Sequence, residues 1–235
     1  MNDASLHLPP LFEPVAVGGR TDPFDRARAL AVAGADPGIV VHNITNECLR
    51  AAIVFAPEVT LEPAMAMMPA CGIGFQNALG SLAPPEVAVH LQWDGAIRVN
   101  GARCGRLRAA AASGDPAAVP DWLVVGLALR WQHPDDAPGA DPDRTALIEE
   151  GCAEIEPTAL LEAWIRHTLV WINRWADDGN APLMAEWRGL AHDLGEQTVI
   201  LGVEGLFVGV DEHFAALLRV AGETRCLAMS RLLEH

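Results

Sequence analysis

Four arginines gather in one short stretch of the chain and are its clearest candidates for binding chemistry. Arg98, Arg103, Arg106 and Arg108 lie within eleven residues. Side chains alternate between the faces of a strand, so Arg106 and Arg108 would share a face. A guanidinium group forms paired hydrogen bonds with a carboxylate or a phosphate, so these arginines could hold an anion. The alternative is a solvated hairpin whose arginines pair with neighbouring acids.

All the basic residues are arginines, since the sequence contains no lysine, and it contains no tyrosine either. A Walker phosphate loop, a Schiff-base enzyme and a lysine-assisted adenylating enzyme each need an ammonium group on a flexible stem. Arginine does not replace lysine in these roles. The composition therefore excludes these chemistries in their usual form.

Acidic residues outnumber basic ones by 31 to 16, which gives a formal net charge of -15. This charge repels nucleic-acid phosphates and anionic membrane surfaces, so neither is an expected partner. The first twenty residues lack a signal-peptide pattern, and the sequence has no uninterrupted apolar run of 18 residues. We therefore predict a cytoplasmic protein.

The cysteines and histidines suggest no catalytic or metal site. The five cysteines are an odd number without paired metal-type spacing, and we interpret them as reduced core thiols. His42, His90 and Cys48 match no hydrolase signature, so they give no nucleophile and base. The Pro/Asp/Gly-rich segment 133–144, including Asp135 and Asp136, lacks the spacing of a calcium loop and is expected to be a solvated loop.

The elements that must position these residues can be predicted from apolar patterns. Short apolar runs at 38–41, 51–56 and 122–129 are typical of buried strands. Segments 62–79 and 157–178 have the length and apolar spacing of buried helices. The sequence thus combines strands and helices in an α+β order.

Local signals fix several boundaries. Asn100-Gly101 between two strand-like runs predicts a tight hairpin. Asp22 followed by Pro23 predicts a helix over 24–33, after an irregular arm through Pro14. Gly179 should end the helix that Pro157 begins, and Gly72-Ile-Gly inside the apolar helix indicates close helix packing.

The last part of the chain has a different texture. Four short strand-like runs, at 198–201, 205–210, 215–220 and 225–229, are separated by glycine or polar turns. We expect a small SH3-like β-barrel there. The predicted organisation is a larger domain over residues 1–190 and a small barrel domain over residues 191–235.

The segment from Gln92 to Leu107 resembles the Lys-Trp-Pro-Asn-Asp strand of biotin protein ligases, with its Asn-Gly hairpin and Lys-x-x-Gly-x-Leu return. Trp93, Asn100-Gly101 and Gly105 keep the register, apart from one residue missing after the turn. Segment 124–129 is similar to the Gly-x-Gly-x-Asn strand of that family. The resemblance implies a biotin/lipoyl ligase-like domain, a mixed, largely antiparallel sheet packed by helices, followed by the small barrel.

The resemblance also implies a chemistry. Biotin and lipoyl ligases activate a carboxylic acid with ATP to an acyl-adenylate, then pass the acyl group to a lysine on a carrier domain. The pocket residues implied here are Gln92, Trp93, Arg103, Gly105, Gly126 and Arg130.

Several residues depart from the family pattern. Gln92 stands at the position of the family's lysine, and Arg130 at that of its asparagine. Asp94-Gly95-Ala96 replaces Pro-Asn-Asp, and Asp94 would repel a phosphate. Segment 42–50, where the Gly/Arg-rich adenylate loop is implied, has no glycine. Arg103 alone matches the family's second lysine with a charged residue.

Three functions stay open, and we assign neither a catalytic residue nor a metal site. The first is a catalytically silent relative that binds a small carboxylic acid such as biotin, lipoate or an acyl group. The second is an active ligase that uses ATP with biotin or lipoate, in which Arg103 supplies the missing charge. The third is an interaction module, a homodimer or a partner of acyl-carrier proteins, with a pocket filled by side chains.

Overall fold

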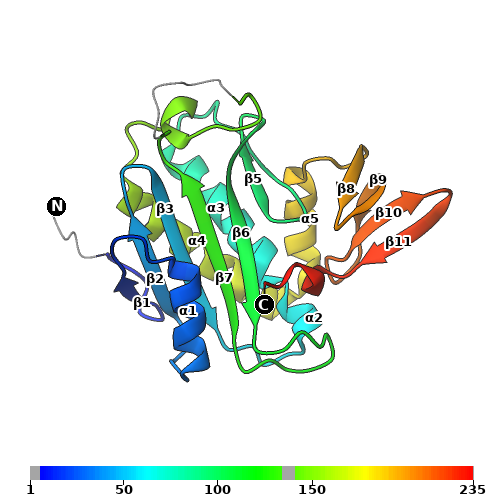
Figure 1. Ribbon diagram of the computed structural model, residues 1–235, viewed down its shortest axis with the longest axis horizontal. Helices are drawn as coiled ribbons and strands as arrows, with labels where there is room; N and C mark the ends of the chain where they lie inside the picture. The colour runs from blue at the N-terminus through cyan, green and yellow to red at the C-terminus, as the bar shows by residue number, and fades with distance from the viewer. Residues whose placement is uncertain (1–5, 134–140, 235) are drawn as a thin grey trace.

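The structure, a computed structural model, describes residues 6–133 and 141–234 of the 235-residue chain. Its main element is a seven-stranded sheet with the strand order β1-β2-β3-β7-β6-β5-β4 (Figure 1). β1 pairs with β2 in parallel, and each other neighbouring pair is antiparallel. The strands are β1 (Glu13–Ala16), β2 (Ile39–Ile44), β3 (Cys48–Phe55), β4 (Val89–Leu91), β5 (Ala96–Val99), β6 (Ala102–Ala111) and β7 (Leu123–Arg130). The expected mixed, largely antiparallel sheet is confirmed.

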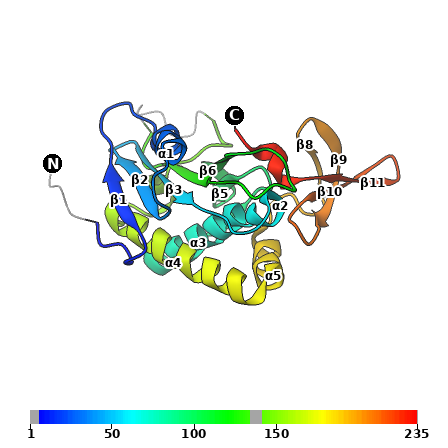
Figure 2. The same ribbon diagram turned by 90° about the horizontal axis from the view of Figure 1, so that it is seen from below.

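Helices cover both faces of this sheet (Figure 2). The long helices α3 and α4 pack together against one face, and α1 lies on the other. The α-helices are α1 (Pro23–Val32), α2 (Leu61–Ala64), α3 (Met67–Leu82), α4 (Pro157–Asp178) and α5 (Asn180–Leu190). Short 3-10 helices span Leu147–Glu150 and Met229–Leu232.

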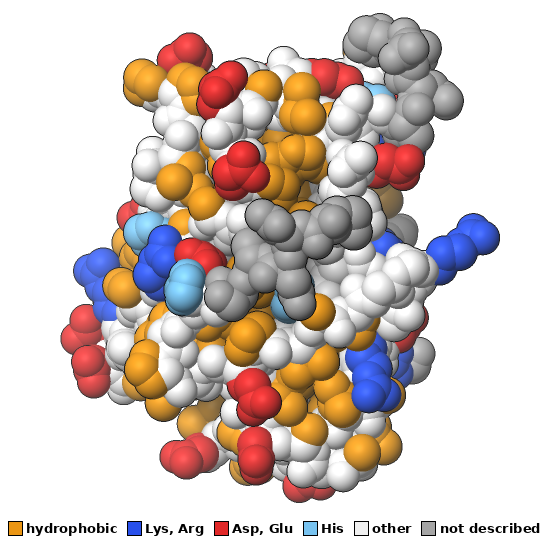
Figure 3. All heavy atoms as spheres, turned by 90° about the vertical axis from the view of Figure 1, so that its left-hand side faces the viewer, with side chains coloured by type: hydrophobic (Ala, Val, Ile, Leu, Met, Phe, Trp, Pro, Cys, Tyr) orange, Lys and Arg blue, Asp and Glu red, His pale blue; other side chains and the backbone are white. Residues whose placement is uncertain are grey.

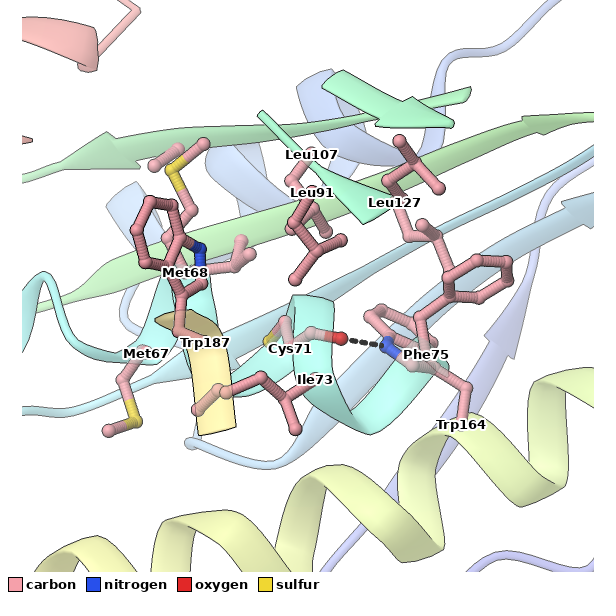
Figure 4. Close-up of a cluster of buried hydrophobic side chains, with 14 of the residues drawn as sticks. Met67, Met68, Cys71, Ile73, Phe75, Leu91, Leu107, Leu127, Trp164 and Trp187 are labelled. Atoms are coloured by element: carbon pink, nitrogen blue, oxygen red, sulfur yellow. Dashed lines mark hydrogen bonds between the residues drawn. The ribbon is translucent and has the colours of Figure 1, made fainter. Parts of the chain in front are cut away.

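The α3–α4 layer is held together by close backbone approach. The indole Nε1 of Trp164 donates a hydrogen bond to the carbonyl of Cys71 across the two helices, at 2.9 Å (Figure 4). A Cβ atom on Gly74 would lie 2.9 Å from the backbone nitrogen of Thr168, so only glycine allows this spacing. The interpretation of Gly72-Ile-Gly as a helix-packing motif is confirmed for Gly74, whereas Gly72 faces Leu91 and Leu107 of the sheet.

The opposite face carries a smaller core under α1. Asp22 caps this helix by accepting the backbone N–H of Phe24 at 3.0 Å, as the Asp-Pro signal predicts. Phe24 is buried against small and branched side chains of the central strands, including Ala52 and Val124. α1 covers one end of this face, and the other end of β3, β7 and β6 extends beyond it.

The β5–β6 hairpin also agrees with its prediction. Asn100 and Gly101 both have positive φ angles, 49° and 92°, which suits a two-residue turn between twisted strands. The turn places Arg98 opposite Arg103 on the returning strand.

The C-terminal strands form a separate sheet, and the structure does not show closure into a barrel. The four predicted strands are present as β8 (Gln197–Ile200), β9 (Val203–Val210), β10 (Ala216–Val220) and β11 (Glu223–Leu227). They pair antiparallel in chain order, with β8 and β11 at opposite edges. A sheet closes only when strand number and tilt bring its edges together, and these four strands remain an open meander.

Two other expectations are corrected. The arm around Pro14 contains the edge strand β1, where a proline is tolerated because its missing N–H faces away from the neighbouring strand. The helix expected over 62–79 is split into α2 and α3. Pro69 has no N–H to donate to the preceding turn, so it is tolerated only near the start of a helix. A new helix therefore begins at Met67, and Pro69 lies in its first turn.

The cysteine interpretation is confirmed in part. Cys71, Cys104 and Cys152 are buried free thiols, whereas Cys48 is half-buried and Cys226 is exposed. Burial raises the pKa of Cys71, and it raises the pKa of Cys104 to about 12. These two thiols are therefore protonated at neutral pH.

The exterior agrees with an acidic protein. On the face drawn in Figure 3, acidic side chains are scattered among apolar and polar ones, and the arginines in view lie toward its two sides. Among the described residues, no helix combines the length and the apolar character needed to cross a bilayer.

Candidate functional site

A cavity of about 930 Å³ lies on the α1 side of the main sheet, beyond the end that α1 covers. Its walls come from β3, β5, β6 and β7 and from the segments that follow β2 and β7. We call it the arginine groove because five of the chain's sixteen arginines line it: Arg50, Arg103, Arg106, Arg130 and Arg144. Glu47, Asp94 and Asp141 are its acidic lining residues among those described.

Strand register explains why several of these side chains meet. Arg50 of β3 lies opposite Ala128 of β7, which lies opposite Arg106 of β6, which in turn lies opposite Ala96 of β5. Directly opposite residues project from the same face of a sheet. One row across four strands therefore places Arg50 and Arg106 on opposite sides of the methyl group of Ala128.

Arg130 joins them from the next position on the same face of β7. It lies opposite Cys48, two residues before Arg50 on β3. Side chains two residues apart on a strand share a face, so Arg130 and Arg50 point into the same space. The Nε atom of Arg50 is buried and has no hydrogen-bond partner among the described residues.

Three of the six predicted pocket residues line the groove. They are Arg103, Gly105 and Arg130. The Nε atom of Arg103 lies 3.7 Å from Oδ2 of Asp143, and about half of its side chain (48%) is exposed. A Cβ atom on Gly105 would lie 2.4 Å from the carbonyl oxygen of Ala128, so glycine lets β6 approach β7 closely.

The other three predicted residues lie outside the groove lining. A Cβ atom on Gly126 would lie 2.6 Å from the ring of Phe24, so Gly126 makes room for α1. Trp93 is buried, and its Nε1 donates to the carbonyl of Phe214 at 2.7 Å. Gln92 donates through Nε2 to Asp193 at 2.6 Å. Trp93 and Gln92 therefore hold the β4–β5 turn against segments near the C-terminal sheet.

The four arginines singled out by spacing all have acidic partners, which confirms the ion pairs of that alternative, although Arg98 is buried and not solvated. Arg98 binds Asp143 at 2.8 Å. Arg106 and Arg108 both bind Glu234, at 2.8 Å and 2.6 Å. These partners come from distant parts of the chain, so they could not be identified from neighbouring residues.

Arg108 is the centre of the larger of these networks. It donates to Asp22 of the α1 cap at 2.8 Å, and its guanidinium carbon lies 4.2 Å from the centre of the Phe24 ring. Hydrogen bonds from Arg108 hold the pKa of Glu234 below its ordinary value. The backbone N–H of Glu234 also donates to the carbonyl of Ala109, which fixes residues 233–234 beside β6. The network joins α1, β6 and the C-terminal segment.

Two groove arginines, by contrast, form no ion pair with any described residue: Arg50 and Arg130. Arg130 was predicted as a site residue, but Arg50 was missed. Its sequence signal was an arginine inside the otherwise apolar run from Leu49 to Phe55. Its importance depends on the pairing of β3 with β7, which the sequence does not reveal.

The connection between β2 and β3 is a tight turn. β2 ends at Ile44 and β3 begins at Cys48. The hydroxyl of Thr45 accepts the backbone N–H groups of Glu47 and Cys48, at 3.3 Å and 3.1 Å. The segment implied to hold an adenylate loop is therefore only long enough to reverse the chain.

Metal-ligating groups do not gather in the described part of the chain. No set of three histidine, cysteine, aspartate or glutamate side chains there is arranged to hold an ion. Asp135 and Asp136 of the predicted acidic loop lie outside the described residues.

Comparison with known structures gives both near and distant relatives. A biotin protein ligase-like protein of unknown function from Silicibacter sp. TM1040 is 52% identical, with a TM-score of 0.93 over 98% of this chain and 100% of that one. Biotin protein ligase from Aquifex aeolicus is 14% identical, with a TM-score of 0.74 over 92% of this chain and 96% of that one. The Leishmania major biotin protein ligase in complex with biotinyl-5-AMP is 16% identical, with a TM-score of 0.58 over 93% and 99% of the two chains.

Comparison with the sequences of known proteins and with models of protein families shows which family the chain belongs to. None of the curated proteins compared with the chain matches it. The sequence model of the biotin/lipoate A/B protein ligase family matches residues 8–189, most of the chain. Together with the 52% identical relative that it matches over nearly its full length, this match shows that the chain belongs to the biotin/lipoate A/B protein ligase family.

Proposed function

We propose that this chain is a catalytically silent biotin protein ligase-like protein that binds a small carboxylic acid in the arginine groove. Biotin, lipoate and fatty acyl groups are the acids that the family suggests. The carrying observation is the groove itself, in which Arg103, Arg130 and Arg50 gather in a chain of net charge -15. Guanidinium groups in a partly enclosed site favour a carboxylate.

The absence of ordinary adenylation is supported by two features. Adenylation builds negative charge between the carboxylate and the α-phosphate, and the chain has no lysine to neutralise it. The Thr45–Glu47 turn leaves no room for a loop that folds over an adenylate. Removing one such donor typically costs ~3–4 kcal/mol of transition-state stabilisation, so the loss of several makes turnover negligible.

Ligand binding can be tested by thermal unfolding with biotin, lipoate, octanoate, ATP and non-hydrolysable acyl-adenylates. A ligand at 100 times its dissociation constant stabilises a fold by about 2.7 kcal/mol, which raises the melting temperature measurably. We expect a shift with at least one acid. The proposal fails if the folded protein responds to none of them.

Catalytic silence is tested separately by pyrophosphate release with ATP and the same acids. We expect no release above background. Release at the rate of an active ligase, dependent on the acid, would contradict the proposal.

An active ligase that uses Arg103 is the second candidate. Arg103 lines the groove, stands at the position of the family's second lysine, and forms a long ion pair of 3.7 Å with Asp143. This candidate requires acid-dependent pyrophosphate release that Arg103→Ala abolishes. The interaction module with a filled pocket stays a prediction, and the cavity of about 930 Å³ among the described side chains favours ligand binding over it.

Other expectations stay predictions. They concern the division into residues 1–190 and 191–235, the cytoplasmic location, the acyl-carrier partner and the homodimer. Capture of a purified acyl-carrier protein with and without acid would test the partner directly.

A further inference from the structure

Three arginines of the groove, Arg50, Arg106 and Arg130, surround the small residue Ala128. Their positions, as well as their charge, restrict the kind of ligand that can bind. Ala128 lies opposite Arg50 on one side and Arg106 on the other, and Arg130 follows two residues later on the same face. Neighbouring strands are about 4.8 Å apart, so the Cα atoms of Arg50 and Arg106 are separated by about 10 Å. A methyl group therefore forms the floor between three long cationic side chains.

Two of these three arginines have no counterion among the residues that the structure describes. Arg50 and Arg130 are diagonal neighbours on adjacent strands, about 7–8 Å apart, which is close enough for their like charges to repel each other. Neither forms an ion pair with a described residue, although Glu47 lines the same cavity. Both side chains are half-buried, which reduces the solvation of their charges.

Arg106 differs because Glu234 already binds it, through Nη2. A guanidinium group has five N–H donors, so one contact with Glu234 leaves others available to a ligand. The side chain is 59% exposed and lines the groove. Arg106 thus adds donors on the side of Ala128 opposite Arg50.

We propose that Arg50, Arg130 and Arg106 form a seat above Ala128 for a compact, doubly negative group. Among small acids, the groove would then favour one that carries a phosphate monoester or two nearby carboxylates over one with a single carboxylate. Arg50 and Arg130, which no described carboxylate pairs, match two negative charges, whereas a single carboxylate would neutralise only one of them. This inference rests on the proposed function, since it specifies the charge of the ligand that the groove takes.

The test is titration of the full chain with inorganic phosphate and with malonate, followed by calorimetry at constant ionic strength. Acetate and chloride serve as singly charged controls. We expect phosphate or malonate to bind, and the stronger of the two distinguishes a phosphoryl from a dicarboxylate ligand. Loss of charge-assisted hydrogen bonds in Arg50→Gln or Arg130→Gln should raise the dissociation constant about tenfold or more.

Arg219→Gln is the matched control, because it removes one positive charge from an exposed strand position outside the groove. It should change the dissociation constant less than twofold. Arg106→Gln, at an exposed position, keeps the test available if a variant of the buried strand misfolds. Equal weakening in Arg219→Gln, or wild-type affinity in Arg50→Gln and Arg130→Gln, would overturn the seat.

The same measurements distinguish a failure of the arginine seat from a failure of the proposed function. If biotin, lipoate or octanoate stabilises the protein but phosphate and malonate do not bind, the seat is wrong and the proposed function stands. If none of the acids and neither dianion binds, both are wrong.

Discussion

Glu234 is the acidic residue that most completely neutralises the arginines of β6. It accepts three hydrogen bonds from Arg108, between 2.6 and 3.0 Å, and one from Arg106. Because the pKa of Glu234 is lowered in the folded state, its ionisation favours folding. This stability is fully present above the ordinary pKa of 4.5 and is lost as the pH falls through the lower, folded value.

We therefore predict that Glu234→Gln lowers the free energy of unfolding at pH 7 by about 1 kcal/mol, as expected for a partly exposed network. The variant should also lose less stability than the wild type when the pH is lowered below 4.5. Urea unfolding from pH 7 to pH 3 measures both effects. Glu223→Gln, on the exposed strand β11, is the control, and an identical response from the two variants would refute the role of Glu234.

A second prediction concerns the cost of unpaired charge. Replacing Arg130 by glutamine removes repulsion from Arg50, so we expect Arg130→Gln to raise the stability of the ligand-free protein by about 0.2–1 kcal/mol. Urea unfolding in a buffer without phosphate measures this change. A comparable gain in Arg219→Gln would show that the effect comes from net charge and not from the neighbouring arginine.

The sequence predicted the positions of individual residues better than the contacts that their side chains make. A motif fixes the spacing of Arg103, Gly105 and Arg130 along the chain, and all three line the groove. Arg50 could not be predicted in this way, since its role arises from strand pairing across the sheet. Trp93 and Gln92 keep the expected positions, but tertiary hydrogen bonds to Phe214 and Asp193 take them out of the groove.

The close packing of helices α3 and α4 depends on Gly74, so a single substitution tests it. A Cβ atom at Gly74 would lie 2.4 Å from Oγ1 of Thr168 and 2.9 Å from its backbone nitrogen, so a side chain there must push the helices apart. We expect Gly74→Ala to cost about 2–3 kcal/mol of unfolding free energy, as overpacking of a core does.

Gly80 in the same helix supplies the control. Among the described residues, the nearest neighbour of a Cβ atom there would be the side-chain amide nitrogen of Gln76, at 3.8 Å. Gly80→Ala should therefore stabilise the helix by about 0.5–1 kcal/mol. Denaturation curves with the same sign for both variants would contradict this account of the interface.

Elements with local signals were predicted well, and those set by tertiary contacts were not. The Asp22 cap, the Asn100-Gly101 hairpin and the Gly179 end of α4 each depend on a few adjacent residues. β1 was missed because its pairing with β2 is what makes it a strand. Closure of a sheet into a barrel depends on edges far apart in sequence, so the four C-terminal strands could be predicted but their open arrangement could not.

Across the whole molecule, Trp93 connects the main sheet to the C-terminal sheet. Its indole donates a hydrogen bond to the backbone carbonyl of Phe214. Phe214 is fully buried between β9 and β10, and its ring meets the ring of Trp187 edge-on, with 6.4 Å between the ring centres. Leaving a buried carbonyl without a donor costs about 1–3 kcal/mol. Trp93→Phe should therefore loosen the C-terminal sheet more than the rest of the protein.

Amide hydrogen exchange tests this expectation, because it reports local opening strand by strand. We expect β9 and β10 to lose protection while β3 and β7 keep it. The control is Trp171→Phe, which removes an indole hydrogen bond to Asn77 between α4 and α3. Uniform loss of protection in Trp93→Phe would mean that the two sheets unfold as a single unit.

The contact between Glu234 and Arg108 also has a consequence for synthesis of the chain. The two residues are 126 positions apart, so β6 leaves the ribosome long before its acidic partner is made. During that interval Arg106 lacks its carboxylate partner, and Arg108 has Asp22 but not Glu234. The nascent chain would expose a transient cationic patch, open to cellular polyanions, which the finished, acidic protein conceals.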